Sequence, residues 1–248
     1  EGELNNTGVI ENSTHIPRGL LEFSINSNSP LVQNNIIDTI KVINSIVRKK
    51  VIDNYEIIVV DDGSYDNTYK KILHLKKTNK IIVIKHDRNR GFGAAYKSGV
   101  KRSNGEYVIM IPGDNAHSSE EISKILKSRG KADIIVPYSK SRGERNLIRF
   151  ILSKLFTRLV NTMFFLNVKY YNGLVLHKGN LIRNITIDTD GFTYQVYALV
   201  TLIKQGASVN YINVEVKERT SGKSSAVNFK NFIEVFKSIV KLRLKKFN

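Results

Sequence analysis

One stretch constrains the fold more than any other part of the chain: Glu56–Thr68, which reads EIIVVDDGSYDNT. Its apolar half, Ile57–Val60, is an unbroken β-branched run, which is typical of a strand buried on both faces of a parallel sheet. The run ends on two adjacent carboxylates, Asp61 and Asp62, followed by Gly63. Ligands of open α/β sheets bind beyond the carboxyl ends of the strands, so this strand is predicted to carry two acids to a ligand site. In isolation the same motif is equally typical of a polar turn.

Apolar runs and helical periodicities alternate around this strand. Short apolar runs predict strands, whereas apolar residues spaced by three and four predict helices. Strand and helix in alternation indicate a parallel α/β sheet. The predicted strands cover 20–25, 56–60, 80–84, 106–111, 132–137 and 209–216, with a strand and turn within 170–180. The predicted helices cover 31–49, 67–75, 118–126, 146–166, 191–206 and 228–247, and a further helix opens near residue 91.

A glycine-rich segment follows the strand predicted at 80–84. It reads RNRGFGAAYKSG, with Gly91 and Gly99 at either end of a run of small residues and Arg90 just before it. Small residues at the start of a helix let its N-terminus approach a ligand or another backbone closely. Close packing of the helix against the sheet explains the glycines equally well. Arg90 and Gly91 are therefore candidates for binding a nucleotide sugar.

A third carboxylate, Asp114, follows the strand predicted at 106–111, in the sequence Pro-Gly-Asp-Asn. Hard divalent cations take oxygen ligands and often bridge to substrate phosphates. Asp114 is thus a candidate ligand of Mg²⁺ or Mn²⁺, with water, a diphosphate and Asn115 or His117 as candidates to complete the shell. The alternative is a turn acid that caps the helix predicted at 118–126.

The charge of the chain is lopsided. Its 39 Lys and Arg against 22 Asp and Glu give a formal net charge of +17, which indicates an anionic partner: nucleic acid, a phosphorylated substrate or an acidic membrane surface. Cysteine is absent, which excludes disulfides and thiolate metal sites. No uninterrupted apolar stretch reaches the length of about 18 residues that is expected of a membrane span.

Two predicted helices are both basic and amphipathic. The helix at 146–166 interleaves apolar residues with Lys154 and Arg158, and the helix at 228–247 combines phenylalanines with several lysines. Such helices can lie in a membrane interface, although a core-packed helix with a solvated basic edge has the same pattern. We expect a loose arm over 1–19, one domain over 20–227 and a basic amphipathic helix over 228–248. The expected location is cytoplasmic and peripheral, at the cytoplasmic face of a membrane.

Taken together, four motifs resemble the inverting family 2 glycosyltransferases of the Rossmann-like GT-A fold, and most of all the dolichyl-phosphate mannose and polyprenyl-phosphate glycosyl synthases. In order they are VVDDGSYDNT, RNRGFGAAYKSG, IPGDNAHSSEEI and ERTSGKSS. Each motif is weak alone, but the four follow the order and spacing of the family. The resemblance implies an α/β fold with a mostly parallel central sheet, flanking helices and a C-terminal amphipathic helix.

The resemblance also implies a donor site and a divalent cation, Mg²⁺ or Mn²⁺. Asp61 and Asp62 match the pair that holds the base and ribose, while Gly91, Ala95 and Gly99 match the helix behind the nucleotide. Asp114 matches the ligand of the metal and diphosphate. Pro112 stands where many members have the first Asp of Asp-x-Asp. Two cations that match the mobile loop over the diphosphate join Asp114 as catalytic residues: Arg219 and Lys223.

On the acceptor side, Arg142, Arg149 and Ser153 resemble the positions that grip the acceptor phosphate. The implied reaction moves a sugar from a nucleoside diphosphate to a polyprenyl phosphate. The alternative is a glycosyltransferase that elongates a glycan, whose hydroxyl acceptor needs a base, and Asp190 is the candidate. A basic nucleic-acid-binding domain is a remote alternative; it is supported by the charge alone, and we expect no nucleic-acid partner.

Overall fold

The computed structural model describes residues 19–25, 32–140, 147–215 and 229–245. Within these ranges it describes no side chains for 19–34, 148–149 and 229–234. The arm predicted at 1–19 therefore lies almost wholly outside the described residues.

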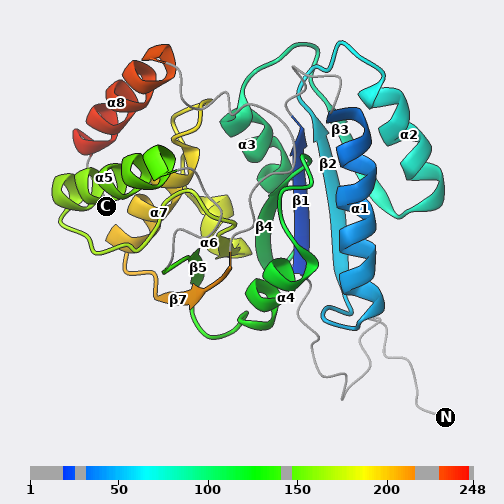
Figure 1. Cartoon of the computed structure of the whole chain (residues 1–248), viewed down its shortest axis with the longest axis horizontal. Coiled ribbons are helices and arrows are strands. Elements are labelled where there is room, and N and C mark those ends of the chain that lie inside the picture. Colours follow the sequence, from blue (N-terminus) through cyan, green and yellow to red (C-terminus); the bar gives the residue numbers. More distant parts are fainter. Residues whose placement is uncertain (1–18, 26–31, 141–146, 216–228, 246–248) are drawn as a thin grey trace, which may run out of the picture.

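The described chain forms one seven-stranded sheet in the order β3-β2-β1-β4-β6-β5-β7 (Figure 1). Strand β6 is antiparallel to both of its neighbours, and the other pairs are parallel. The sheet is therefore mostly parallel, as predicted. The strands are β1 (Gly19–Ile25), β2 (Tyr55–Asp61), β3 (Ile81–Lys85), β4 (Tyr107–Pro112), β5 (Ile134–Tyr138), β6 (Leu176–Lys178) and β7 (Val209–Asn213).

Helices cover both faces of this sheet. Helices α1, α2 and α4 pack with one apolar cluster, while α3, α5, α6, α7 and α8 pack with the other (Figure 1). The helices are α1 (Val32–Arg48), α2 (Thr68–Thr78), α3 (Phe92–Arg102), α4 (Ser119–Lys127), α5 (Leu147–Phe164), α6 (Gly179–Asn184), α7 (Tyr194–Lys204) and α8 (Phe229–Arg243).

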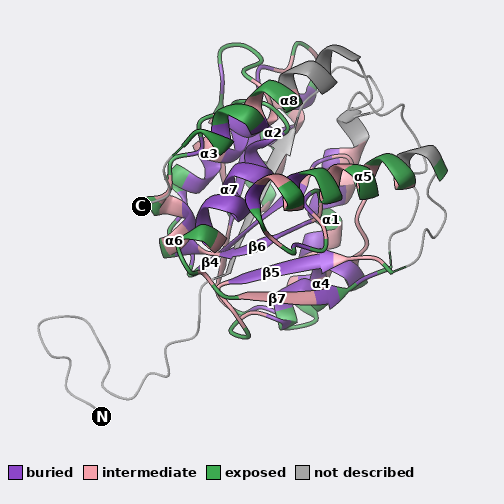
Figure 2. Ribbon diagram, turned by 90° about the vertical axis from the view of Figure 1, so that its left-hand side faces the viewer, coloured by how far each residue is buried: buried purple, intermediate pink, exposed green. Residues whose placement is uncertain are grey.

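Strand β2 explains why both clusters form. Ile57 and Val59 belong to the cluster under α1, whereas Ile58 and Val60 belong to the cluster under α3. Successive side chains of a strand point to opposite faces, so an unbroken apolar run supplies both layers at once. Helix α7 is buried almost throughout and lies beneath α5 and α8, which keep exposed outer faces (Figure 2).

The structure departs from the predicted elements in the segment after α5. The strand predicted within 170–180 has only three residues, and it is followed by helix α6, which the sequence did not predict. The strand predicted at 209–216 ends at Asn213 and lies at the edge of the sheet. Helix α8 lies within the range of the predicted C-terminal helix, and its buried Ile239 and Leu242 join the core. None of the described helices is both long and apolar enough to cross a bilayer.

A buried histidine lies in the middle of this core. His177 on β6 is 1% exposed, and its Nδ1 lies 3.5 Å from the Tyr96 hydroxyl. Its Nε2 has no hydrogen-bond partner among the described residues. Burial disfavours the charged imidazolium and lowers the pKa of His177 from 6.5 to about 3.

This burial predicts a pH dependence of stability. Between pH 3 and 6.5 the unfolded chain binds a proton at His177 that the folded chain does not, so the free energy of unfolding falls as the pH falls below 6.5. The contribution is at most about 1.4 kcal/mol per pH unit. Urea unfolding of the wild type and of His177→Leu, from about pH 7 to about pH 5, measures it. Equal pH slopes in the two proteins would contradict the assignment.

Candidate functional site

The carboxyl ends of the parallel strands bring the predicted acids to one edge of the sheet. In the register, Ser24 of β1 pairs with Val60 of β2 on one side and with Pro112 of β4 on the other. Asp61 and Asp114 therefore follow strand ends that are level with one another and separated only by β1. Because neighbouring strands lie about 4.8 Å apart, the two strand axes are roughly 10 Å apart.

Asp61 ends β2 with its side chain buried. Its Oδ1 accepts hydrogen bonds from the Ser64 hydroxyl and, at 3.1 Å, from the Ser64 backbone N–H. Its Oδ2 is also buried but has no partner among the described residues. A buried carboxylate oxygen is costly without a donor, so this oxygen is suited to accept a hydrogen bond from a ligand.

Asp62 is occupied by the protein itself. Its Oδ1 accepts from His86 Nδ1 at 2.6 Å and from the Arg90 N–H at 3.0 Å, and its Oδ2 accepts from the Gly91 N–H at 2.8 Å. The side chain is fully buried. The two adjacent acids therefore have different surroundings: Asp62 binds the segment between β3 and α3, while one oxygen of Asp61 has no partner among the described residues.

Glycine is required where this segment meets β2. Gly63 has a φ of +72°, and a Cβ there would collide with the backbone of Arg88 and Asn89. The turn after β2 thus packs backbone against backbone on the β3–α3 segment. After this turn, Asp66 Oδ1 accepts from the Thr68 N–H at 2.9 Å at the start of α2.

The start of α3 is covered by another segment of the chain. The N–H groups of Gly93 and Ala94 both donate to the Asp190 carbonyl, at 2.8 and 3.3 Å. Gly91 has a φ of +101°, and a Cβ there would lie 2.5 Å from that same oxygen. The small residues were predicted to let the start of this helix approach either a ligand or another backbone, and in the structure it approaches the backbone of Asp190. Ala95 is buried in the core beneath the sheet, and Gly99 is buried as well.

Asp190 binds helix α3 through its backbone carbonyl as well as through its side chain, which the sequence did not indicate. Its carboxylate pairs with Lys97 of α3 at 2.8 Å, and its side chain is 58% exposed. The carboxylate and the carbonyl of one residue therefore both bind α3. The role predicted for Asp190 as the base for a hydroxyl acceptor stays a prediction, and in this structure the carboxylate is paired with Lys97.

Asp114 lies in a turn that the protein supports from both sides. Its Oδ1 accepts from the Ala116 N–H at 3.2 Å, and the Asn115 N–H donates to Thr39 Oγ1 at 3.1 Å. Ser118 caps α4, because its hydroxyl accepts from the Glu121 N–H at 3.2 Å. Capping of α4, the alternative role for Asp114, thus belongs to Ser118. The described residues contain no cluster of three or more metal-ligating acids and histidines.

With this geometry in place, comparison with known proteins decides the family. Residues 34–184 match the family model described as glycosyl transferase family 2, which covers more than half of the chain. The chain belongs to this family. It is a glycosyltransferase, and the predicted membership of family 2 is confirmed; the first three of the four motifs lie within the matched residues.

The proteins with similar sequences include glycosyltransferases that are named for dolichyl phosphate, a lipid phosphate. The dolichyl-phosphate beta-glucosyltransferase of Dictyostelium discoideum is 28% identical over 225 residues, which cover 84% of this chain and 68% of that protein. A UDP-N-acetylglucosamine–dolichyl-phosphate N-acetylglucosaminyltransferase of Methanococcus voltae is 33% identical over 104 residues, which cover 35% of this chain and 41% of that protein.

Solved structures confirm the GT-A fold of this glycosyltransferase. Glucosyl-3-phosphoglycerate synthase from Mycobacterium tuberculosis, crystallised with Mn²⁺, uridine diphosphate and phosphoglyceric acid, matches with a TM-score of 0.71. The match covers 94% of this chain and 80% of that one at 14% identity. At this level of identity the likeness concerns the fold alone.

Several site residues predicted for this glycosyltransferase lie where the structure says little. Arg142, Arg219 and Lys223 fall outside the described residues. Arg149 lies in α5, but its side chain is not described. Ser153 is half-buried on α5, where its carbonyl accepts from the Thr157 hydroxyl at 2.9 Å. Their predicted roles stay predictions.

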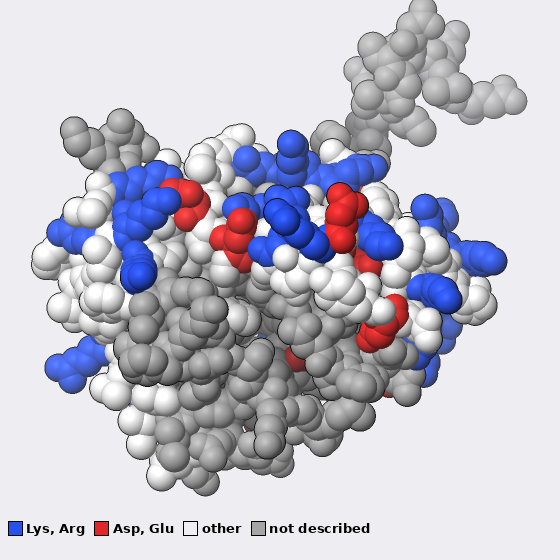
Figure 3. All heavy atoms as spheres, turned by 90° about the horizontal axis from the view of Figure 1, so that it is seen from above, with Lys and Arg blue, Asp and Glu red and all other residues white. Residues whose placement is uncertain are grey.

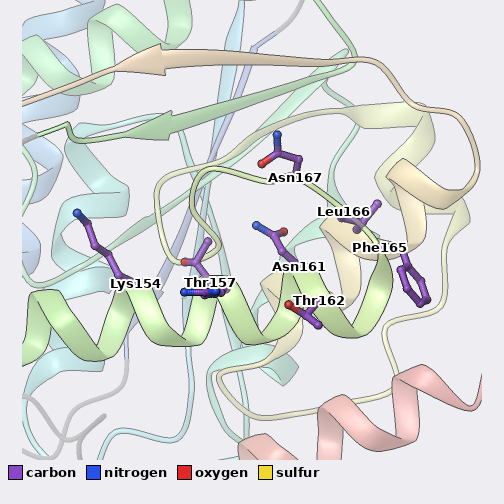
Figure 4. A pocket seen from close by; sticks show the side chains of 8 residues that line it. Lys154, Thr157, Asn161, Thr162, Phe165, Leu166 and Asn167 are labelled. Carbon is purple, nitrogen blue, oxygen red and sulfur yellow. The ribbon is translucent and has the colours of Figure 1, made fainter.

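A cavity of about 520 Å³ opens beside α5, one turn after Ser153. Figure 4 shows Thr157 and Asn161 rising from α5 toward Asn167 in the chain that follows the helix. Asn161 is held in place, because its amide donates to the Val168 carbonyl and accepts from the Val168 N–H. The cavity is lined by Lys154, Thr157, Arg158, Asn161, Thr162, Phe165, Leu166 and Asn167.

The carboxyl edge of the glycosyltransferase is a basic surface. Viewed from that edge, Lys and Arg make up most of the charged surface drawn for the described residues, and Asp and Glu are few (Figure 3). Arg90, predicted as a nucleotide-sugar contact, has an exposed side chain before α3. A basic surface suits anionic substrates such as sugar nucleotides and phosphates.

Two residues of this edge escaped the sequence analysis. His86 and Ser98 continue the hydrogen bonds of Asp62. In the segment between β3 and α3, the sequence pattern indicated only the glycines and Arg90. A signal was present in the sequence, since His86 comes directly after Lys85, the last residue of β3, and so lies just beyond a strand end at the same edge as Asp61.

Proposed function

We propose that this glycosyltransferase moves a sugar from a nucleoside diphosphate to a polyprenyl phosphate, with inversion at the anomeric carbon. One observation carries the proposal: the register that brings Asp61, with its unpartnered buried oxygen, and Asp114 to one edge of the sheet. The donor's nucleoside would lie against Asp61 and its diphosphate near Asp114. The names of the relatives support the lipid phosphate as the acceptor.

In the proposed reaction, an oxygen of the acceptor phosphate attacks the anomeric carbon from the side opposite the diphosphate. The bond from that carbon to the diphosphate breaks, and its electron pair leaves with the nucleoside diphosphate. A phosphate is already anionic at neutral pH, so the step requires no strong base. This agrees with the ion pair that engages Asp190 with Lys97. Arg219 and Lys223 are assigned to the departing diphosphate.

A divalent cation, Mg²⁺ or Mn²⁺, fits the residues at the end of β4. Asp114 supplies a hard oxygen ligand, while the neighbouring His117 is engaged with Glu121 at 3.0 Å. One carboxylate suits a cation that is bound mainly through substrate phosphates and water rather than in a protein cage. When bound, such a cation offsets the charge that develops on the leaving diphosphate. The solved relative that contains Mn²⁺ and uridine diphosphate supports the same assignment.

The acceptor is tested by supplying radiolabelled UDP-glucose, UDP-N-acetylglucosamine and GDP-mannose with undecaprenyl or dolichyl phosphate, or with oligosaccharides. We expect label in the organic phase with polyprenyl phosphate. The bond formed to phosphate should be labile to mild acid, as glycosyl phosphates are. Label that enters only oligosaccharide would replace the proposal with the glycan-elongating alternative.

Asp114 is tested by the metal dependence of nucleotide binding. Ligands of the native state raise its melting temperature by mass action. We expect nucleoside diphosphates to raise the melting temperature of the wild type more with Mn²⁺ or Mg²⁺ than without. Asp114→Ala should lose the metal-dependent part and reduce transfer by roughly 100-fold or more. Glu120→Ala, which removes an exposed acid of α4, is the control. A full metal-dependent shift in Asp114→Ala would exclude Asp114 as a ligand.

A lipid acceptor also gives a role to the outer faces of α5 and α8, which lie side by side (Figures 1 and 2). Residues spaced by four lie on one face of a helix, and in α5 such a stripe is apolar and exposed. Helix α8 adds Phe236 and Val240, which are also exposed. The stripe on α5 consists of Leu147, Ile151, Leu155 and Leu159.

Exposed cations flank these apolar faces: Lys154 and Arg158 on α5, and Lys237 and Arg243 on α8. We infer that the two helices contact an anionic membrane surface. Apolar side chains would enter the interface, and the cations would bind lipid head groups. The alternative, a core-packed helix with a solvated basic edge, does not account for the five leucine and isoleucine residues of α5 that are at least 40% exposed.

Vesicle sedimentation tests this surface. The wild type should bind vesicles that contain phosphatidylglycerol more tightly than neutral vesicles, and added salt should weaken the binding. Leu155→Glu, in the centre of the α5 stripe, should lower the affinity about 10-fold, because an apolar contact is replaced by a repelled charge. Leu73→Glu changes an exposed leucine on α2 and should have no effect. Equal affinity of the wild type and Leu155→Glu would refute the assignment.

A further inference from the structure

A buried chain of hydrogen bonds runs from the end of β2 to the second turn of α3. Asp62 Oδ1 lies 2.6 Å from His86 Nδ1, and His86 Nε2 lies 2.8 Å from Ser98 Oγ. The side chains of Asp62 and His86 are 0% and 5% exposed. None of these contacts belongs to the backbone hydrogen bonds of a helix or a strand. This series of side-chain hydrogen bonds therefore needs another explanation.

The chemistry of the three groups fixes the orientation of the imidazole ring. An ionised carboxylate only accepts hydrogen bonds, so His86 Nδ1 must carry its proton and donate. On the other side of the ring, Nε2 and the Ser98 hydroxyl form a hydrogen bond of 2.8 Å, and a hydroxyl can serve there as donor or as acceptor. Ser98 thus holds the ring from one side while Asp62 holds it from the other.

The same carboxylate also sets the backbone that follows β3. Asp62 accepts from the N–H groups of Arg90 and Gly91, which lie immediately before α3. His86 donates to Oδ1 of the Asp62 carboxylate. With that bond in place, one orientation of the carboxylate allows it to accept from the N–H groups of Arg90 and Gly91 as well. The ring and the hydroxyl behind it therefore determine where Arg90 and Gly91 lie, although they contact neither residue through the hydrogen bonds described.

We propose that His86 and Ser98 are positioning residues of the donor site. They orient the Asp62 carboxylate, which holds Arg90 and Gly91 in place for the nucleotide, while Asp61 contacts the nucleotide directly. Asp62 thus acts through the backbone of the β3–α3 segment rather than as a ligand of the donor. The effect on donor binding rests on the proposed function; the effect on the backbone does not.

The first measurement is hydrogen exchange of the backbone amides in the free protein, read residue by residue by NMR. Ser98→Ala removes the hydroxyl but leaves the imidazole, and His86→Leu removes both contacts of the ring. We expect both variants to speed exchange at Arg90 and Gly91 about 10-fold, with no change in β7 or α7. His86→Asn, whose amide can still donate to Asp62, should exchange more slowly than His86→Leu.

The matched control is Ser103→Ala, which makes the same change at the C-terminal end of α3, where the hydroxyl donates to the Val100 carbonyl at 2.7 Å. It should leave exchange at Arg90 and Gly91 unchanged. Unchanged exchange in both Ser98→Ala and His86→Leu would overturn the proposal. Faster exchange throughout the protein would overturn it as well, because the residues would then act on global stability.

The second measurement is the affinity for uridine diphosphate and guanosine diphosphate by calorimetry. Ser98→Ala and His86→Leu should weaken binding about 10-fold, and in turnover they should raise the KM for the donor while kcat changes little. If neither nucleotide binds the wild type, the proposed function fails while the exchange result still decides the positioning role. If exchange speeds up but the affinity is unchanged, the role of the segment in donor binding is wrong.

Discussion

The carboxyl edge of the sheet, where the sugar donor is proposed to bind, depends on the buried carboxylate of Asp62. An isolated buried charge is strongly unfavourable, and it is tolerated only when its oxygens accept several hydrogen bonds. Here the imidazole of His86 and two backbone N–H groups supply them. The hydrogen bonds of this carboxylate therefore join the end of β2 to the segment before α3. Gly63 makes that contact possible, because any side chain there would meet the Arg88 backbone.

From this contact, a continuous series of interactions reaches the outer helices. The Asp190 carbonyl accepts from the first amides of α3, and Thr193, at the start of α7, exchanges a hydrogen bond of 2.8 Å with Ser238 of α8. Asp188 pairs with Lys241 of α8 at 2.7 Å, an exposed contact that contributes little by itself. Helix α8 is thus packed against the segment that closes the carboxyl edge of the sheet. In the proposed function, the same helix contacts the membrane that contains the acceptor.

The sequence predicted those parts of the fold whose signal is local. The β-branched run of Ile57–Val60 and the four-residue spacing in α5 identify a strand and a helix without knowledge of their neighbours. Strand β6 has three residues, and its position between β4 and β5 comes from tertiary pairing, which leaves no periodicity to detect. The adjacent Asp61 and Asp62 show the same limit at the site. Both are strand-end acids in the sequence, and only the donors around each one distinguish a residue that holds the backbone from one that keeps an oxygen for a ligand.

Charge explains why a strongly basic chain suits the proposed reaction better than transfer to a hydroxyl. Sugar transfer to a phosphate brings together two anions, the donor diphosphate and the acceptor phosphate, and their repulsion rises steeply as water is excluded. A divalent cation bound by Asp114, together with the side chains of Arg219 and Lys223, would offset the charge of the diphosphate. Arg142 and Arg149 would offset the charge of the acceptor phosphate. A hydroxyl acceptor carries no charge and instead needs a base, yet Asp190 is engaged with Lys97. The net charge of +17 therefore suits the proposed pair of anionic substrates better than it suits a neutral acceptor.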